Sequence, residues 1–324
     1  MKASEIVIVT HNNQFHMDDV IACFMLRQIY PYSTIVRTRE REKMEKGDFV
    51  VDVGDEYAPE RKRYDHHQRT FNVKYDEKYP SKMSSAGLVF KHYGEEFLAA
   101  IGVSLAQHKE IVIKQIYEDY FLPVDANDNG VDISDAPKYK ERSLEDVVRS
   151  LNPVSFDKSA SYEEQEAERL RCFHNAMEFM GSDLVRFCKK VEHDTRRAAE
   201  LLQKDWALLG DKEYLVLSQN YTASSLVPYY NEKYQKNVKI LIYPKKTQNG
   251  TEYSIMCLPK RHVKYSPQAP LCARWRGLRE KELSREPGLE DANFVHATGF
   301  CGSAKSLETA KRMAEGALKE NYES

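Results

Sequence analysis

Histidines and aspartates gather in the first part of the chain in a pattern suited to binding divalent metal ions. Four of the ten histidines, His11, His16, His66 and His67, lie within the first 67 residues and stand beside aspartates. The aspartates of these segments and of a later one are Asp18, Asp19, Asp52, Asp55, Asp65, Asp125 and Asp128. Imidazole and carboxylate together are ligands for manganese, iron or zinc, whereas magnesium prefers oxygen ligands.

The number of these groups favours two ions over one. A single ion would leave several of them idle, whereas three histidines and three or four carboxylates fit two ions that share a bridging aspartate. Two ions about 3.5–4 Å apart can share a nucleophilic water and hold both the attacking and the leaving oxygen at phosphorus. Any one His–Asp pair can instead be a surface or capping arrangement, and Asp19 alone is better interpreted as a helix N-cap than as a ligand.

The elements around these residues predict an α/β fold. A run of β-branched residues over 5–10 is followed by a polar loop and a helix over 20–29, and a second apolar run covers 48–53. Short β-rich runs that alternate with helices are typical of a parallel sheet with helices on both faces. Ligands bind beyond the carboxyl ends of such strands, so the polar residues after Thr10 and Val51 are expected at the site.

Further helices follow this sheet. Ser84 and Ser85 are typical of a helix start, and a helix over 109–122 is expected to end at Pro123. The longest helical pattern covers 162–209, with an apolar seam that favours packing within the chain over a coiled-coil partner. Gly181-Ser182-Asp183 could split this pattern into two helices.

The last third of the chain has a different pattern. Apolar runs over 214–217, 238–243 and 253–258, with the turn residues Asn249-Gly250 between the last two, predict a sheet that contains a hairpin. A helix over 306–319 closes the chain. We therefore predict a larger parallel-sheet domain over 1–208 and a smaller α+β domain over 209–324.

Composition excludes several classes of protein. Hydrophobic residues make up 41% of the chain and charged residues 30%, a mixture that excludes disordered and fibrous proteins. The net charge of −2 creates no field that would recruit a polyanion, so any nucleic-acid surface must be a local patch. Neither a signal peptide nor a membrane anchor is recognised, and six widely spaced cysteines favour reduced thiols. These features predict an intracellular protein, cytoplasmic or nuclear, with an organellar location left open.

Several motifs resemble a known family. Asp65-His66-His67 is the name-giving motif of the DHH superfamily of phosphoesterases, which includes RecJ nucleases, oligoribonucleases and manganese-dependent inorganic pyrophosphatases. The segments that more closely resemble the Myg family within it are Thr10–Asp19, Val51–Asp55, Tyr64–Gln68, Ser84–Gly87 and Trp275–Arg279. This likeness extends over nearly the whole chain. It implies a DHH-type catalytic domain followed by a DHHA-like domain.

The resemblance also implies a role for each residue. One metal ion would be held by His11, His16 and Asp52, and the other by Asp18, Asp52, His66 and Asp128. Asp52 would then be the bridge, and His67 would face the substrate phosphate. Asp125 is an alternative to Asp128, while Asp65 and Ser85 are additional candidates. The implied cofactors are two divalent cations, Mn²⁺ first among them, with no haem or nucleotide cofactor.

One stretch of the smaller domain is strongly basic. Between Leu258 and Glu286 it holds three acidic residues against eight basic ones: Lys260, Arg261, Lys264, Arg274, Arg276, Arg279, Lys281 and Arg285. This excess suits a polyanion, although Lys260 and Lys281 taken singly fit a solvated face equally well. Trp275 could stack on a base or fill a core. The turn over 296–302 loosely resembles the nucleotide-gripping loop of the DHHA domain, so we expect Arg274, Arg276, Arg279 and His296 to contact substrate.

These features predict a two-metal phosphodiesterase. The resemblance implies an exonuclease that acts on single-stranded RNA from the 3′ end, with no membrane partner. One alternative keeps the site and changes the substrate to pyrophosphate or a short oligonucleotide. A second alternative is a metal-stabilised binding protein without turnover.

Overall fold

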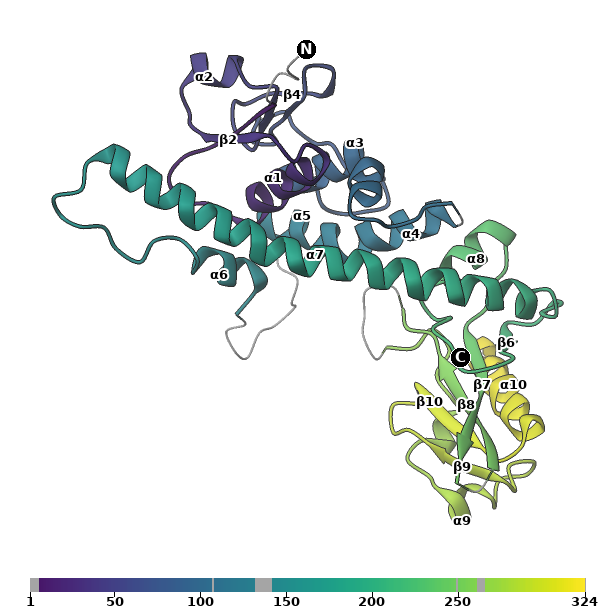
Figure 1. Ribbon diagram of the computed structural model, residues 1–324. Coiled ribbons are helices and arrows are strands. Elements are labelled where there is room, and N and C mark those ends of the chain that lie inside the picture. Colours follow the sequence, from purple (N-terminus) through teal and green to yellow (C-terminus); the bar gives the residue numbers. More distant parts are fainter. Residues whose placement is uncertain (1–5, 107, 132–141, 249, 261–265, 324) are drawn as a thin grey trace. The chain divides into compact units, whose positions relative to one another are not determined.

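Two five-stranded sheets organise the chain, one in each of two compact units. The structure is a computed structural model, and it describes residues 6–106, 108–131, 142–248, 250–260 and 266–323. Figure 1 shows the elements in chain order. The units are Met1–His193 and Asp194–Ser324, so the end of the long helix α7 (Tyr162–Trp206) groups with the second unit. Our prediction ended the first domain later, at residue 208.

The first sheet is mostly parallel. Its order is β2-β1-β3-β5-β4, and β1 (Val7–Thr10) pairs in parallel with β2 (Thr34–Arg37) and β3 (Phe49–Val51). β5 (Arg63–Tyr64) continues the parallel pairing on β3, and β4 (Tyr57–Ala58) closes the edge in antiparallel fashion. Parallel strands end at a common edge, so residues that follow them are brought together.

Helices cover the two faces of this sheet unequally. α1 (Met17–Ile29) and α3 (Ser85–Ala100) pack on each other and bury the main core against one face. The opposite face carries the short α2 (Arg41–Glu45), whose Met44 packs against a small cluster of valines. The prediction of a mixed α/β unit is confirmed, and the second face has much less helical cover than expected.

Pro123 does not end its helix, contrary to our prediction. α4 (Lys109–Ile116) runs into a π-helical segment, Tyr117–Phe121, and then into α5 (Leu122–Asp128). Pro123 lies in the first turn of α5, directly after the π-helical segment, and so stands within a continuous helical stretch. The helical stretch continues through Pro123 and carries Asp125 and Asp128.

α7 is a single helix of 45 residues, so Gly181-Ser182-Asp183, which could have split it, does not. Gly181 faces the ring of Phe24 on α1, and a Cβ on Gly181 would overlap that ring. The glycine therefore serves close packing between two helices within the first unit. A glycine with helical neighbours on both sides is tolerated at a cost of about 1 kcal/mol relative to alanine.

The second unit has a mixed sheet. Its order is β6-β7-β8-β10-β9, formed by β6 (Tyr214–Val216), β7 (Ile240–Thr247), β8 (Gly250–Cys257), β9 (Ala292–Val295) and β10 (Cys301–Ala304). β6 and β7 are parallel and the other pairs antiparallel. The predicted hairpin is confirmed as β7–β8, with Thr247 opposite Gly250; Asn249 lies outside the described residues.

Among the described residues, the remaining α-helices are short apart from the last one, and two 3-10 helices cover Pro59–Arg61 and Ala273–Trp275. α6 (Leu144–Arg149) belongs to the first unit, and α8 (Val227–Tyr234), α9 (Glu280–Leu283) and α10 (Leu307–Glu323) belong to the second. α10 packs on β7, β8 and β10. None of the helices in the described ranges is long and apolar enough to cross a membrane.

Gly181→Ala tests the packing of α7 on α1. Alanine favours the helix by about 1 kcal/mol, but forcing its methyl group against a buried ring typically costs 1–3 kcal/mol or more. We expect net destabilisation in denaturant unfolding, whereas the exposed neighbour Ser182→Ala should change stability by less than about 0.5 kcal/mol. A Gly181→Ala protein more stable than the wild type would contradict this packing.

Candidate metal centre

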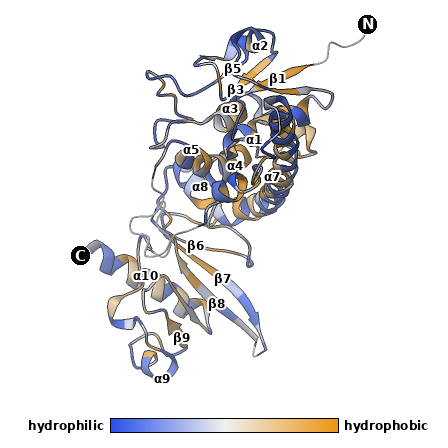
Figure 2. Cartoon of the chain, turned by 90° about the vertical axis from the view of Figure 1, so that its left-hand side faces the viewer, coloured by the Kyte–Doolittle hydropathy of each residue, from blue (hydrophilic) through white to orange (hydrophobic). Residues whose placement is uncertain are grey.

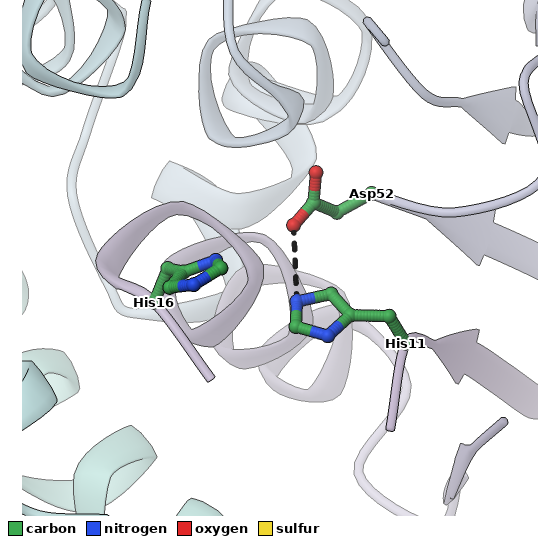
Figure 3. Close-up of side chains that lie close together, drawn as sticks. All are labelled: His11, His16 and Asp52. Atoms are coloured by element: carbon green, nitrogen blue, oxygen red, sulfur yellow. Dashed lines mark ion pairs between the residues drawn. The ribbon is translucent and has the colours of Figure 1, made fainter. Parts of the chain in front are cut away.

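Four separate segments of the first unit bring histidines and aspartates to the carboxyl edge of its sheet. His11 follows β1, Asp52 follows β3, and His66 with His67 follows β5. The first turn of α1 supplies Asp18, and α5 ends at Asp128. Figure 3 shows His11 and His16 on the same side of Asp52, with the ring of His11 directed at its carboxylate.

The loop between β1 and α1 is shaped by a capping box. His16 is the N-cap residue of α1, and its backbone N–H donates to Asp19 Oδ1 at 2.9 Å. Asp19 is therefore the third residue of the helix and not its N-cap, which corrects our prediction. Its other oxygen, Oδ2, lies 3.2 Å from His11 Nε2, so Asp19 also belongs to the cluster. Sequence reasoning set Asp19 aside as a capping residue. A capping role occupies only one carboxylate oxygen, however, and the other remains available to the cluster.

The backbone at Asp52 is strained. Its φ of 57° lies in the left-handed region, which a residue other than glycine adopts at a cost. The side chain is almost fully buried, with Ser85 Oγ donating to its Oδ1 at 3.4 Å. Strain of this kind persists where the surrounding structure requires one position for a side chain. Ser85, the first residue of α3, thus contacts the cluster through Asp52.

Ligand atoms in this cluster form overlapping groups, within each of which all ligand atoms lie less than 4.8 Å apart. The groups are His11–His16–Asp52, Asp52–His66–His67, Asp18–His66–Asp128 and Asp18–Asp19–Asp52. Asp52 belongs to three of the four. Every residue that we predicted to hold a metal ion is present in at least one group.

The hydrogen bonds of His11 leave one ring nitrogen available to an ion. Its Nδ1 donates to the carbonyl oxygen of Asn12 at 2.9 Å, so Nε2 is the nitrogen that can coordinate an ion once it has lost its proton. Nε2 lies 3.3 Å from Asp52 Oδ2. Such a hydrogen bond at the remote nitrogen is usual for metal-binding histidines because it fixes the orientation of the ring.

Buried polar atoms show that the cluster fits a cation. Within the described residues, His11 Nε2, His66 Nε2, Asp19 Oδ2 and both oxygens of Asp18 are buried without a well-formed hydrogen bond, although His11 lies 3.2 Å from Asp19 and His66 lies 3.0 Å from Asp128. Buried polar and charged groups without a well-formed hydrogen bond carry a free-energy penalty. Divalent cations coordinated by these atoms would remove that penalty. The donor set of imidazole and carboxylate suits Mn²⁺, Fe²⁺ or Zn²⁺.

Charges in the cluster are strongly coupled. Burial by itself lowers the pKa of both His11 and His66, but neighbouring carboxylates outweigh it and raise each pKa to about 10. The carboxylates concerned are Asp19 and Asp52 for His11, and Asp128 and Asp52 for His66. Burial and the surrounding aspartates raise the pKa of Asp18 well above its usual range. The aspartates therefore favour protonated imidazole rings when no metal ion supplies positive charge.

Asp125 and Asp128 have different environments. Asp125 is fully buried and accepts hydrogen bonds from Ser84 N and Ser84 Oγ, each at 2.8 Å, and from the Tyr117 hydroxyl at 2.6 Å. Asp128 lies one helical turn further on, with Oδ2 3.0 Å from His66 Nε2. The structure thus places Asp128 in the cluster and gives Asp125 a bracing role between α3 and α5. A Cβ on Gly87 would overlap the Asp125 carboxylate, so this packing requires the glycine.

Asp65 orients the histidines that follow it. Its Oδ1 accepts from the His66 backbone N–H at 2.8 Å and from His67 Nδ1 at 2.7 Å, and its Oδ2 accepts from the Asp55 N–H at 2.6 Å. Asp65 is thus fully engaged with its neighbours. The side chain of His67 is 58% exposed, so its Nε2 can face a ligand. The hydrogen bond to Asp65 raises the pKa of His67, which favours its protonated form.

The basic residues of the second unit are partly engaged in local structure. Arg274 Nε lies 3.1 Å from Glu286, and Arg276 Nε donates to the Leu271 carbonyl at 2.8 Å. Arg279 and His296 are exposed. Trp275 is buried in the core and donates to Glu286, so it fills a core and does not offer a stacking surface. Arg261 and Lys264 lie outside the described residues.

Glu145 was missed by sequence reasoning. Its Oε2 accepts from the backbone N–H of Met17 at 2.8 Å and so satisfies a free donor in the first turn of α1. It also contributes to the raised pKa of Asp18, after burial and the nearer aspartates. No local pattern could have revealed this residue, because 128 positions separate it from Met17.

Taken together, the first unit is an α/β unit with a buried His/Asp cluster at the carboxyl edge of its sheet. The MYG1_exonuc family, described as an uncharacterised protein family (UPF0160), matches residues 7–318. The chain belongs to this family, which confirms the predicted resemblance to Myg proteins.

Relatives align along nearly the whole chain. The MYG1 exonuclease of Rattus norvegicus is 31% identical over 96% of this chain and 84% of its own length. The MYG1 exonuclease of Homo sapiens is 31% identical over 96% of this chain and 85% of its own length. A MYG1 protein of Schizosaccharomyces pombe is 32% identical over 96% of this chain and 97% of its own length. An exopolyphosphatase-related protein from Bacteroides fragilis, a solved structure, aligns at 13% identity with a TM-score of 0.23, too low to support a conclusion.

Substitution of Asp125 and Asp128 separates bracing from metal binding. Asp128→Asn should lower the bound Mn²⁺ measured by elemental analysis while leaving the unfolding free energy nearly unchanged. Asp125→Asn should instead destabilise the protein by about 1–3 kcal/mol, because a buried hydrogen-bonded acceptor is lost. If Asp128→Asn keeps full metal content and a stable Asp125→Asn loses an ion, the two roles are exchanged.

Metal binding should release protons. Because the pKa of His11 and of His66 is raised to about 10, both rings are protonated near neutral pH and must lose that proton to coordinate an ion. We expect Mn²⁺ affinity to rise roughly tenfold per pH unit for each proton released, below that pKa. Calorimetry in buffers of different ionisation enthalpy measures the release, and His11→Asn should reduce it. An affinity independent of pH would contradict this picture.

Proposed function

We propose that the protein is a two-metal phosphodiesterase, a 3′-to-5′ exonuclease that acts on single-stranded RNA. The observation that carries the proposal is the pair of ligand groups His11–His16–Asp52 and Asp18–His66–Asp128. Asp52 links the two, because it also groups with Asp18 and with His66. Two ions bound there would supply an activated water and neutralise charge on a phosphodiester. The names of the rat and human relatives, MYG1 exonuclease, support the same class of reaction.

The residues divide into those that hold ions and those that contact substrate. Asp52 would bridge the two ions, with His11 and His16 on one side and His66, Asp18 and Asp128 on the other. His67 donates from Nδ1 to Asp65 and keeps Nε2 for a phosphate oxygen. Its raised pKa increases the fraction of imidazolium, which suits contact with an anion.

RNA as the substrate rests on the family resemblance and on the basic stretch of the second unit. Arg279 and His296 are exposed there and available for phosphates. Arg274 and Arg276 already bind Glu286 and the Leu271 carbonyl. That engagement favours the alternative of a small phosphate compound, because a polymer requires several phosphate contacts beyond the cleaved bond.

A direct assay tests the proposal. The protein is supplied with Mn²⁺ and offered end-labelled single-stranded RNA, single-stranded DNA and pyrophosphate. The expected result is stepwise shortening of the RNA from its 3′ end. Hydrolysis of pyrophosphate alone would establish the small-molecule alternative, and binding of RNA without cleavage would establish a binding protein.

His67→Ala separates substrate contact from metal binding. Since His67 is proposed to touch the phosphate, its loss should cut turnover by on the order of a hundredfold or more, the usual scale for a lost transition-state contact. Metal content should stay unchanged. The exposed His193→Ala on α7 is the matched control and should keep wild-type turnover. Equal loss of metal and activity in His67→Ala would make His67 a metal ligand.

A further inference from the structure

The sheet of the second unit has a partly open face that the proposed function does not use. Side chains alternate between the two faces along a strand. Ile240, Ile242 and Ile255 point into the core that α10 covers. Tyr243 and Met256, which follow Ile242 and Ile255, therefore lie on the opposite face, and both are partly exposed.

One row of residues crosses this open face. Tyr243 on β7 pairs with Ser254 on β8, Ser254 pairs with Ser303 on β10, and Ser303 pairs with Phe294 on the edge strand β9. Neighbouring strands are about 4.8 Å apart, so the Cα atoms of Tyr243 and Phe294 stand roughly 14 Å apart. Ser254 and Ser303 lie between them, and Ser303 is buried with its Oγ accepting from the Asn293 amide at 3.4 Å. The row thus has an aromatic side chain at each end and small polar groups between them.

A hollow of about 340 Å³ adjoins the tyrosine end of the row. Leu241, Tyr243 and Met256 form its sheet side, and polar residues of the loop 220–224 form its rim. This volume falls in the range of small-ligand sites. Figure 2 shows that β7 begins in hydrophobic residues and becomes hydrophilic towards its hairpin with β8.

Cations stand near both aromatic residues. The guanidinium of Arg279 lies 5.7 Å from the centre of the Phe294 ring. Lys245 is exposed and occupies the next position after Tyr243 on the same face of β7. Glu252 faces Lys245 across the β7–β8 pair, so Arg279 carries more of the available positive charge.

Single-stranded nucleic acid matches this chemistry. Unpaired bases stack on aromatic side chains of an open sheet, and cations beside the rings neutralise the backbone phosphates. A stable protein interface would instead require a more extensive apolar core than one row separated by serines.

We propose that the row Tyr243–Ser254–Ser303–Phe294 binds single-stranded nucleic acid. One base stacks on Tyr243 beside the hollow, another stacks on Phe294, and the intervening backbone passes over Ser254 and the Asn293 amide beside Ser303. Arg279 contacts a phosphate at the phenylalanine end. The inference rests on the proposed function for the class of ligand, and it assigns to the second unit residues that the basic stretch did not include.

Binding of a fluorescently labelled oligouridylate to the full chain tests the proposal. The measurement is fluorescence anisotropy in EDTA, so that binding is observed without cleavage. We expect Tyr243→Ala and Phe294→Ala each to weaken binding by about fivefold or more, the scale of one lost stacking contact. Tyr243→Phe, which keeps the ring, should bind as the wild type does. Tyr322→Ala on α10, exposed to 66%, is the matched control and should leave affinity unchanged.

Two outcomes would overturn the proposal. The first is wild-type affinity in both alanine variants. The second is equal weakening in Tyr243→Phe and Tyr243→Ala, which would show that stacking is not the interaction. Thermal melting of each variant verifies that the fold is retained.

Hydrolysis of bis(p-nitrophenyl) phosphate with Mn²⁺ reports separately on the metal centre. If the alanine variants cleave this small diester and bind oligouridylate as the wild type does, the row does not bind nucleic acid and the proposed function still stands. Weakened binding in those variants without any cleavage would support the row and remove the proposed function.

Discussion

The burial of several aspartates around one space is the constraint on which the first unit depends. Asp18, Asp19 and Asp52 are each almost fully buried, with carboxylate oxygens within 4.8 Å of one another. Like charges at this separation in a region of low dielectric repel strongly, and each also loses its hydration. These carboxylates raise the pKa of His11 and of His66, so both rings favour the protonated form that offsets the repulsion. Divalent ions would supply the same charge with better geometry, and the ligand atoms already converge.

Several candidate ligands are held in place by nearby aspartates that accept hydrogen bonds from the protein. Asp65 fixes the segment containing His66 by accepting from its backbone N–H. Asp125 ties α5 to the first turn of α3 through Ser84, one turn before Asp128. Asp19 caps α1 with one oxygen and directs the other at His11. Such outer hydrogen bonds orient metal ligands and account for much of the precision of a metal site.

The second unit uses its side chains differently. Local contacts occupy Arg274, Arg276 and Trp275, so a count of basic residues overstates the surface available to a polyanion. The open face of the sheet instead offers aromatic rings separated by small polar residues, with Arg279 at one end. Electrostatic attraction to the basic stretch and stacking on the sheet would be complementary in the proposed binding, because attraction to phosphates weakens as salt is added, whereas stacking acts through the flat face of each base.

By itself the sequence determined the alternation of strands and helices, the helix start at Ser84 and the set of residues that can bind metal ions. These properties follow from local periodicity, capping and side-chain chemistry, which neighbouring residues decide. Only the tertiary structure decided that α7 passes unbroken through Gly181 and that helical structure continues beyond Pro123, because Phe24 and a π-helical segment set those outcomes. Which of Asp125 and Asp128 joins the candidate metal cluster likewise depends on how the folded chain places α5. Both side chains are carboxylates, and the partners that separate them, Ser84 and His66, are distant in sequence and close only in the folded chain.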